Sequence, residues 1–326
     1  MLHDLSGTPD KAGRVSPDEA VQLLATGQVV ALPTETVYGL AARALDPDSV
    51  RRIFDVKGRP ADNPVIVHVR SIEDARELAE VPPLAERLAA AYWPGPLTMV
   101  LPARPIVPDV VTAGRDTVAV RAPNHPVFQS ILERLGEPLA APSANPSGTP
   151  SPTCAEHVLS DYHGAVPVVD GGACTIGVES TVVQPLHDCV VLLRPGSVSR
   201  EDLAAIVDVP IVMPSAAQVG ASPGTRYRHY APRACVRVFE RESDVRTACG
   251  RASGRNSCVV LSRLPIEGVR DVRFMSRATL YDELRRADHL GVDEILVHCD
   301  GDVRADEAWM DRLLRAASTT ETLPEP

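Results

Sequence analysis

The stretch Thr181-Val-Val-Gln-Pro-Leu-His-Asp-Cys-Val-Val-Leu-Leu193 decides the fold class of this chain. Residues 181–185 and 190–193 are short and apolar, and only four residues separate them, which predicts an antiparallel hairpin. Parallel neighbours need a much longer crossover connection. The stretch therefore favours a mixed α/β sheet over a parallel Rossmann sheet for the part of the chain that contains it.

Strand and helix signals alternate upstream of this hairpin. Ser16-Pro17-Asp18-Glu19 predicts a capping box, and Asp46-Pro47 begins a helix that Gly58 ends. The other predicted strands are 29–32, 64–69, 97–101, 117–121, 139–141 and 166–169. The other predicted helices are 71–80, 82–93, 126–135, one capped by Thr153-x-x-Glu156, and 199–207. This alternation predicts a sheet wrapped by helices.

The composition changes after residue 207. Residues 208–233 are rich in Pro, Ser, Gly and Ala and predict a linker. Beyond it, strands at 236–239, 258–261 and 294–298 alternate with helices at 244–251, 280–290 and 306–317, the pattern of a small, Rossmann-like α/β unit. We expect a first domain at 15–207, a linker at 208–233 and a C-terminal domain at 234–317.

Overall composition narrows the class of protein. The 326 residues suffice for two cores, and 44% hydrophobic with 23% charged residues is typical of a globular protein. The formal net charge of −10 argues against direct nucleic-acid binding. We find no signal peptide and no apolar run of roughly 20 residues, so no membrane association is expected. Seven cysteines without a C-x-x-C pair predict reduced thiols in a cytoplasmic protein.

Nucleotide-binding fingerprints are missing, so any nucleotide pocket must be assembled from separate segments. Four polar segments at predicted strand ends are candidates: 33–40, 57–68, 117–148 and 178–196. Each segment alone is explained at least as well by turns and helix termini. Together they supply Lys57, Arg59, Arg121 and Arg194, which favours one anion-binding pocket.

Structural explanations compete at single positions. Lys57 and Arg59 follow a helix and are expected as surface cations, where they also favour the helix dipole. His68, on an apolar strand, is commonly a satisfied core residue. Arg121 ends an apolar strand and needs an anionic partner if it is buried.

In their order along the chain, these segments make the sequence similar to the threonylcarbamoyl-AMP synthase family in its long two-domain form. That form joins a YrdC-like catalytic domain to a C-terminal accessory domain. The similarity rests on PTETVYGL, KGRP with NPVIVH, WPGPLT, VRAP, APSANPSG, ESTVV and RPG, and on the linker SPGTRYRHYAP. It implies a twisted, mixed YrdC-like sheet with a concave face that holds the substrates.

The resemblance also implies residue roles. L-Threonine would be bound by Thr36, His68, Arg121, Ala141 and Thr181. ATP would be bound by Lys57, Arg59, Asn63, Thr117, Ser143, Asn145, Ser151, Arg194 and Tyr230. Lys57 and Arg59 would be the catalytic pair on the phosphates, and Arg121 would take the carboxylate of L-threonine. The linker would close over the site and bring Tyr230 or Tyr227 to the nucleotide.

The implied reaction joins L-threonine, bicarbonate and ATP into threonylcarbamoyl-AMP and releases pyrophosphate, for tRNA modification by a partner threonylcarbamoyl transferase. Mg²⁺ would arrive with ATP, since no dedicated acidic metal site is evident and Glu179 is expected to be structural. Two alternatives compete. An RNA-binding module is disfavoured by the charge and by few aromatic platforms. A hydrogenase-maturation carbamoyl-adenylate synthase would carry zinc-finger cysteines and an acylphosphatase unit.

Overall fold

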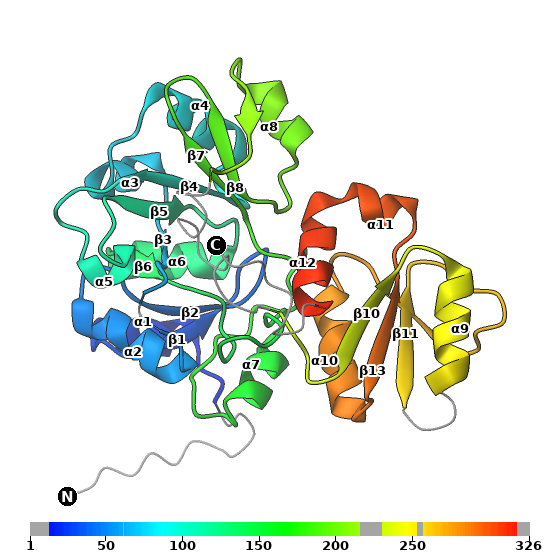
Figure 1. Cartoon of the computed structure of the whole chain (residues 1–326). Coiled ribbons are helices and arrows are strands. Elements are labelled where there is room, and N and C mark those ends of the chain that lie inside the picture. Colours follow the sequence, from blue (N-terminus) through cyan, green and yellow to red (C-terminus); the bar gives the residue numbers. More distant parts are fainter. Residues whose placement is uncertain (1–12, 61, 216–229, 253–256, 318–326) are drawn as a thin grey trace, which may run out of the picture.

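A computed structural model describes residues 13–60, 62–215, 230–252 and 257–317, which form a larger and a smaller unit (Figure 1). The larger unit contains a nine-stranded sheet in the order β1-β2-β6-β3-β5-β4-β7-β8-β9. Its strands are β1 (Val30–Leu32), β2 (Gly39–Arg43), β3 (Ile66–His68), β4 (Leu97–Pro102), β5 (Thr117–Arg121), β6 (Leu139–Ala140), β7 (Thr181–Pro185), β8 (Val190–Arg194) and β9 (Ile211–Val212). The strands β7 and β8 pair antiparallel while β3 and β5 pair parallel, so the predicted mixed sheet and its hairpin are confirmed.

Eight helices lie in the described part of this larger unit. They are α1 (Pro17–Ala25), α2 (Pro47–Lys57), α3 (Ile72–Leu78), α4 (Pro83–Tyr92), α5 (Asp109–Thr112), α6 (Pro126–Leu135), α7 (Ala155–Asp161) and α8 (Arg200–Ile206). The capping box of α1 forms as predicted, and Gly58 ends α2 in the left-handed conformation, with a φ of 59°. The side chain of Thr153 does not cap α7: the N-cap is Cys154, and Thr153 contacts His157 instead.

Successive side chains of the central strands point to the two opposite faces of the sheet. Val67 of β3 and Val120 of β5 pack into the main core, whereas Ile66 and Ala119 belong to a separate cluster on the opposite face. Successive side chains of a strand point to opposite faces, so His68, two residues after Ile66, also faces away from the main core. Helices α1 and α6 cover one end of this second face.

Two expectations about the strands need correction. Residues 166–169 form no regular strand: Val168 makes only isolated bridges, to Arg14 and Ala31. The strand β2, which follows the polar segment 33–40 and pairs with β1, is not among the predicted strands.

The smaller unit has a four-stranded parallel sheet in the order β10-β13-β11-β12, as expected for a doubly wound unit. Its elements are β10 (Cys235–Phe239), α9 (Glu242–Ala252), β11 (Cys258–Ser262), β12 (Val272–Phe274), α10 (Leu280–Leu290), β13 (Glu294–His298), α11 (Gly301–Ala305) and α12 (Glu307–Ala317). Helices α10 and α12 pack on one face and α9 on the other. Figure 1 places α10 and α12 toward the larger unit.

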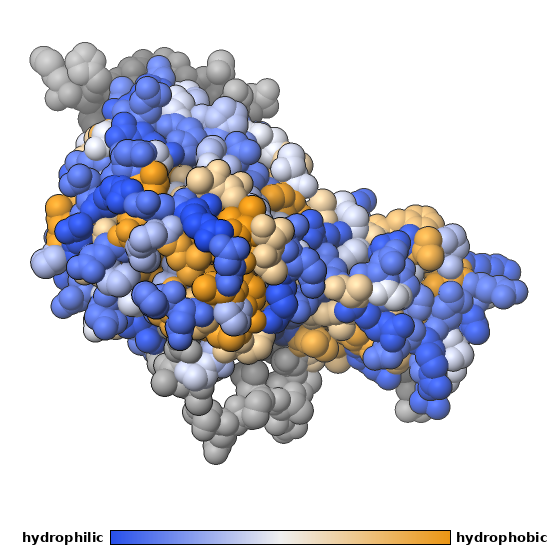
Figure 2. Space-filling model, turned by 90° about the horizontal axis from the view of Figure 1, so that it is seen from above, coloured by the Kyte–Doolittle hydropathy of each residue, from blue (hydrophilic) through white to orange (hydrophobic). Residues whose placement is uncertain are grey.

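The two units meet through buried polar contacts. Arg285 of α10 forms an ion pair with Asp161 at 2.7 Å, and Asp282 lies 3.2 Å from His157. On the face shown in Figure 2, the smaller unit projects from one side of the larger one, which carries apolar side chains among hydrophilic ones. The domain boundaries at 207 and 233 stay predictions, and residues 216–229 of the linker lie outside the described part. In the described ranges no helix has the length and apolar character that a bilayer crossing needs.

Candidate active site

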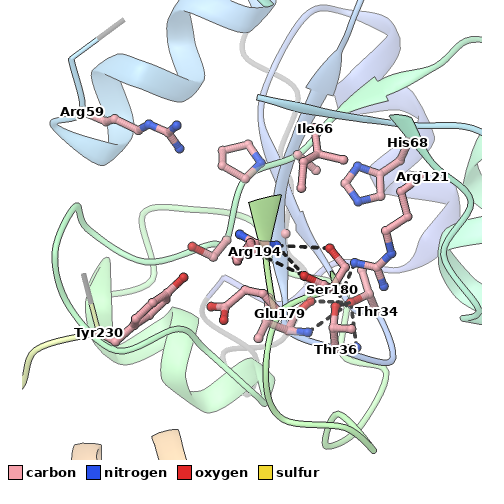
Figure 3. A pocket seen from close by; sticks show the side chains of 15 residues that line it. Thr34, Thr36, Arg59, Ile66, His68, Arg121, Glu179, Ser180, Arg194 and Tyr230 are labelled. Atoms are coloured by element: carbon pink, nitrogen blue, oxygen red, sulfur yellow. Dashed lines mark hydrogen bonds between the residues drawn. The ribbon is translucent and has the colours of Figure 1, made fainter. Parts of the chain in front are cut away.

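A pocket opens on the second face of the nine-stranded sheet (Figure 3). Eight residues predicted for the site line it: Thr36, Arg59, His68, Arg121, Ala141, Ser143, Arg194 and Tyr230. Further lining comes from Thr34, Val37, Gly39, Ile66, Pro142, Glu179 and Ser180. Segments far apart in the sequence therefore converge on one cavity, which bears three arginines.

The ends of β3 and β5 place His68 beside Arg121. The two strands run parallel and pair His68 directly with Arg121. Burial, and then the charge of Arg121, lower the pKa of His68 to about 3, so its imidazole is neutral near pH 7. The rings of His68 and Phe128 have centroids 5.1 Å apart, so His68 packs against an apolar neighbour while it lines the pocket.

Arg121 is held rigidly by groups from three segments. Its Nη1 donates to Thr36 Oγ1 at 2.9 Å, and its Nε donates to the Gly95 carbonyl at 3.2 Å. Its Nη2 lies 2.7 Å from Glu35 Oε1, which supplies the anionic partner that a buried arginine needs. Nη2 carries two hydrogens, so it can also donate to a ligand while it pairs with Glu35.

The turn before β2 is built by its own hydroxyl groups. Thr34 Oγ1 donates to the Val37 carbonyl at 2.6 Å and accepts from the backbone N–H groups of Thr36 and Val37 at 3.1 Å. This arrangement is a side-chain-stabilised turn. It fixes Thr36 where its hydroxyl meets Arg121.

Lys57 is not the surface cation that we expected. The side chain is 5% exposed, and its Nζ donates to the carbonyls of Ser143 at 2.5 Å and Asn145 at 2.6 Å. Burial, with the neighbouring charge of Arg59, lowers the pKa of Lys57 well below its usual range. Lys57 thus supports the loop that carries Ser143 into the pocket, while Arg59 lines the pocket itself.

Six other residues predicted for the site do not line the pocket. They are Lys57, Asn63, Thr117, Asn145, Ser151 and Thr181. Thr181 Oγ1 donates to the Val198 carbonyl at 2.7 Å and accepts from its N–H at 3.0 Å, so this hydroxyl is already engaged in the fold. Ser151 donates to Glu179 at 2.5 Å, and Thr117 begins β5. The roles that resemblance gives these six residues stay predictions.

Several buried polar atoms around the pocket have no hydrogen-bond partner among the described residues. They are both side-chain amide atoms of Asn63, Nδ1 of His68, Oδ1 of Asn145 and Oε2 of Glu35. Buried polar groups are nearly always paired in native proteins, so such a cluster calls for an explanation. A polar ligand is the simplest one.

Glu179 and Arg194 form the wall opposite Arg121. Arg194 Nη2 donates to the carbonyl of Ser180 at 2.9 Å and to its hydroxyl at 3.2 Å (Figure 3). Burial would raise the pKa of Glu179, but the charges of Arg312 and Arg194 and a hydrogen bond from Ser151 bring it down to about 2. Glu179 is therefore ionised, and its engagement by Ser151 and Arg312 supports the structural role expected for it.

Sequence reasoning missed the contribution of the smaller unit. Tyr281 and Arg312 both donate to Glu179, at 2.8 Å each, and their positions on apolar-faced helices gave no functional signal. Tyr230 lines the pocket and is 4% exposed, whereas Tyr227 lies outside the described residues. No cluster of three or more His, Cys, Asp or Glu side chains suited to a metal occurs among the described residues.

Comparisons with known proteins agree with this architecture. A family model described as "Telomere recombination" matches residues 22–196, and the model of the threonylcarbamoyl-AMP synthase C-terminal domain matches residues 198–318. The chain is 42% identical to the threonylcarbamoyl-AMP synthase of Pyrococcus abyssi over 91% of its length and 93% of the relative's. It is 40% identical to that of Bacillus subtilis, over 92% of each chain.

A solved structure extends the agreement to three dimensions. The crystal structure of P. abyssi Sua5 complexed with L-threonine superposes with a TM-score of 0.84 and 40% identity, covering 93% of this chain and 96% of that one. The match spans both units. The chain therefore belongs to the threonylcarbamoyl-AMP synthase family in its two-domain form, and is an enzyme of that family.

Proposed function

We propose that the chain converts L-threonine, bicarbonate and ATP into L-threonylcarbamoyl-AMP and pyrophosphate. The observation that carries the proposal is the convergence of Arg59, Arg121 and Arg194 on one pocket beside unpaired buried polar atoms. The relative of known structure was crystallised with L-threonine. A pocket of this composition suits substrates that are small, polar and anionic.

L-Threonine would bind at the end of the pocket near β3 and β5. Its carboxylate would meet Arg121 Nη2, which keeps donor capacity, and its hydroxyl would meet the neutral imidazole of His68. Thr36 and Ala141 would complete this end. The groups that bind the amino acid all come from the larger unit.

The chemistry then requires positioning and charge neutralisation rather than a covalent nucleophile. The amine of L-threonine combines with bicarbonate to give a carbamate and water. A carbamate oxygen attacks the α-phosphorus of ATP, and pyrophosphate leaves with the bonding electrons. Arg59 and Arg194 would neutralise charge on the phosphates, where preorganised cations are most effective.

Mg²⁺ would enter as the ATP complex. The carboxylate that lines the pocket, Glu179, already accepts from Ser151, Tyr281 and Arg312. The described residues thus fit a metal held chiefly by the phosphates, which would offset phosphate charge. We propose that Tyr230 and the linker then shield the product, a mixed anhydride that water destroys, until a tRNA threonylcarbamoyl transferase accepts it.

The test is pyrophosphate release by the purified chain with each substrate omitted in turn. We expect release to require both L-threonine and bicarbonate. L-Serine, which lacks the methyl group, serves as the matched control substrate and should react more slowly. Equal pyrophosphate release without L-threonine would refute the proposal.

A further inference from the structure

Glu179 lines the pocket in the larger unit but takes two hydrogen bonds from the smaller one. The hydroxyl of Tyr281, on α10, donates to Oε2 at 2.8 Å, and Nε of Arg312, on α12, donates to the same oxygen at 2.8 Å. Ser151 donates to the other oxygen at 2.5 Å. The side chain of Arg312 is fully buried, and its Nη1 also donates to Asp311 at 2.6 Å. Arg312 therefore bridges its own helix and the pocket wall.

Tyr281 and Arg312 also contact the ring of Tyr230. The rings of Tyr230 and Tyr281 stack with centroids 5.4 Å apart, and the guanidinium of Arg312 lies 5.4 Å from the centroid of Tyr230. Both contacts are favourable when buried. Tyr230 has a φ of +66°, a conformation that a bulky residue adopts only where its surroundings impose it.

The two ends of the pocket thus differ in origin. Thr36, His68 and Arg121 make their hydrogen bonds and strand pairing within the larger unit, where only the neighbouring Val37 packs against the core of the smaller unit. Glu179 and Tyr230, at the end near Arg194, contact α10 and α12 of the smaller unit directly. An anionic substrate bound at Arg194 would therefore sense the docking of the smaller unit more strongly than an amino acid bound at Arg121.

We propose that Arg312 and Tyr281 are positioning residues of the active site. By holding Glu179 and Tyr230 together, they build the wall beside Arg194, so the nucleotide end of the pocket is complete only when the smaller unit is docked. This inference rests on the proposed function, because it assigns ATP to the end of the pocket that contains Arg194.

The test compares two buried arginines that both cross the interface. Arg312→Met removes the contact with Glu179. Arg285→Met removes an ion pair with Asp161 and a hydrogen bond to the Pro150 carbonyl, and neither partner lines the pocket. Binding of MgATP and of L-threonine is measured separately by calorimetry on the full chain. We expect Arg312→Met to weaken the binding of MgATP at least about tenfold and the binding of L-threonine less than about twofold. Arg285→Met should leave the ratio of the two affinities unchanged.

Two further variants keep the test decisive. If Arg312→Met does not fold, Tyr281→Phe can replace it, because this change removes one hydroxyl and retains the stacked ring. It should weaken the binding of MgATP about threefold and leave the binding of L-threonine unchanged. Adding Glu179→Gln to Arg312→Met should recover much of the lost MgATP affinity, because no unpaired carboxylate remains.

The inference would be wrong if Arg312→Met and Arg285→Met changed the two affinities equally. It would also be wrong if Arg312→Met weakened the binding of both ligands equally. In either case Arg312 would be only a contact that docks the smaller unit. Failure of the proposed function is distinguishable from this result. It would appear in the unsubstituted chain, as pyrophosphate release that does not need L-threonine.

Discussion

Lys57 illustrates how a single side chain can shape a pocket that it does not line. Its ammonium group lies under the loop of Ser143 and Asn145 and donates to two of its carbonyls. Charge-assisted hydrogen bonds offset part of the cost of burying the cation. The sequence placed Lys57 at a helix C-terminus, where lysine is usually solvated. Its burial depends on a loop that begins 86 positions later, which no local pattern reveals.

Arg121 is the opposite case, because its environment could be predicted. An arginine that ends an apolar strand needs an anionic partner if it is buried; Arg121 is buried, and Glu35 is that partner. The position of Arg121 follows from strand alternation. The identity of the partner does not, since it depends on the register of β3 with β5 and on the turn at Thr34.

We predict that Lys57 and Arg59 respond differently to truncation. Lys57→Met should lower the free energy of unfolding by about 2 kcal/mol, because it leaves two carbonyls without their donor. Arg59→Ala should cost less than about 1 kcal/mol, since the side chain is only half-buried, but should slow pyrophosphate release at least about tenfold. Urea unfolding and a pyrophosphate assay measure the two effects.

Arg51→Ala, on the exposed side of the same helix, is the control for this pair and should change neither quantity measurably. A Lys57→Met variant as stable as the unsubstituted chain would show that the loop does not depend on this lysine. Normal turnover of Arg59→Ala would remove Arg59 from the catalytic pair.

At the scale of elements, strong local sequence signals predicted the ends of several helices and strands correctly. The helices at Pro126–Leu135 and Leu280–Leu290 and the strand at Thr117–Arg121 begin and end at the predicted residues. Proline at the first turn and glycine beyond the last explain this accuracy for the helix at 126–135. The strand predicted at 166–169 was wrong, because an apolar run does not specify a pairing partner.

Close approach between elements fixes the position of Arg194. A Cβ added to Gly196 would lie 2.2 Å from the backbone nitrogen of Thr181, so the loop after β8 packs directly on β7. Glycine is required here by space. The sequence motif RPG contains this glycine, but only the structure shows what it touches.

We predict that Gly196→Ala forces the loop that follows Arg194 away from β7. The clash is with backbone, which cannot move aside cheaply, so the free energy of unfolding should fall by about 2 kcal/mol or more and MgATP should bind more weakly. Gly301→Ala is the matched control, because a Cβ there meets nothing within 4 Å. Equal behaviour of the two variants in urea unfolding and calorimetry would contradict the assigned packing.

At the scale of the whole molecule, the sequence indicated two units but not how they share a pocket. Glu179 lies 102 positions before Tyr281 and 133 before Arg312, and no periodicity connects residues so far apart. Helical periodicity explained the apolar faces of α10 and α12. It could not distinguish a tyrosine or arginine that completes a core from one that completes the pocket of a neighbouring unit.

A close backbone approach between the units, at Gly177, is open to a direct test. Gly177 has a φ of +78°, and a Cβ there would lie 2.3 Å from the carbonyl oxygen of Ala278 in the smaller unit. Gly172 has a similar φ of +81°, but a Cβ there meets nothing within 4 Å. Alanine at either position carries the same backbone strain of about 1 kcal/mol. The difference between the two variants therefore isolates the contact between the units.

We predict that Gly177→Ala lowers the free energy of unfolding by about 2 kcal/mol more than Gly172→Ala, because the added Cβ meets backbone of the smaller unit and relieving this clash disturbs the contact between the units. Small-angle scattering should show a larger radius of gyration for Gly177→Ala alone. MgATP should bind more weakly to this variant while L-threonine binds normally, since the displaced unit carries Tyr281 and Arg312 but none of the residues around Arg121. If Gly177→Ala lost affinity for both ligands equally, the interface would influence the whole pocket rather than its nucleotide end.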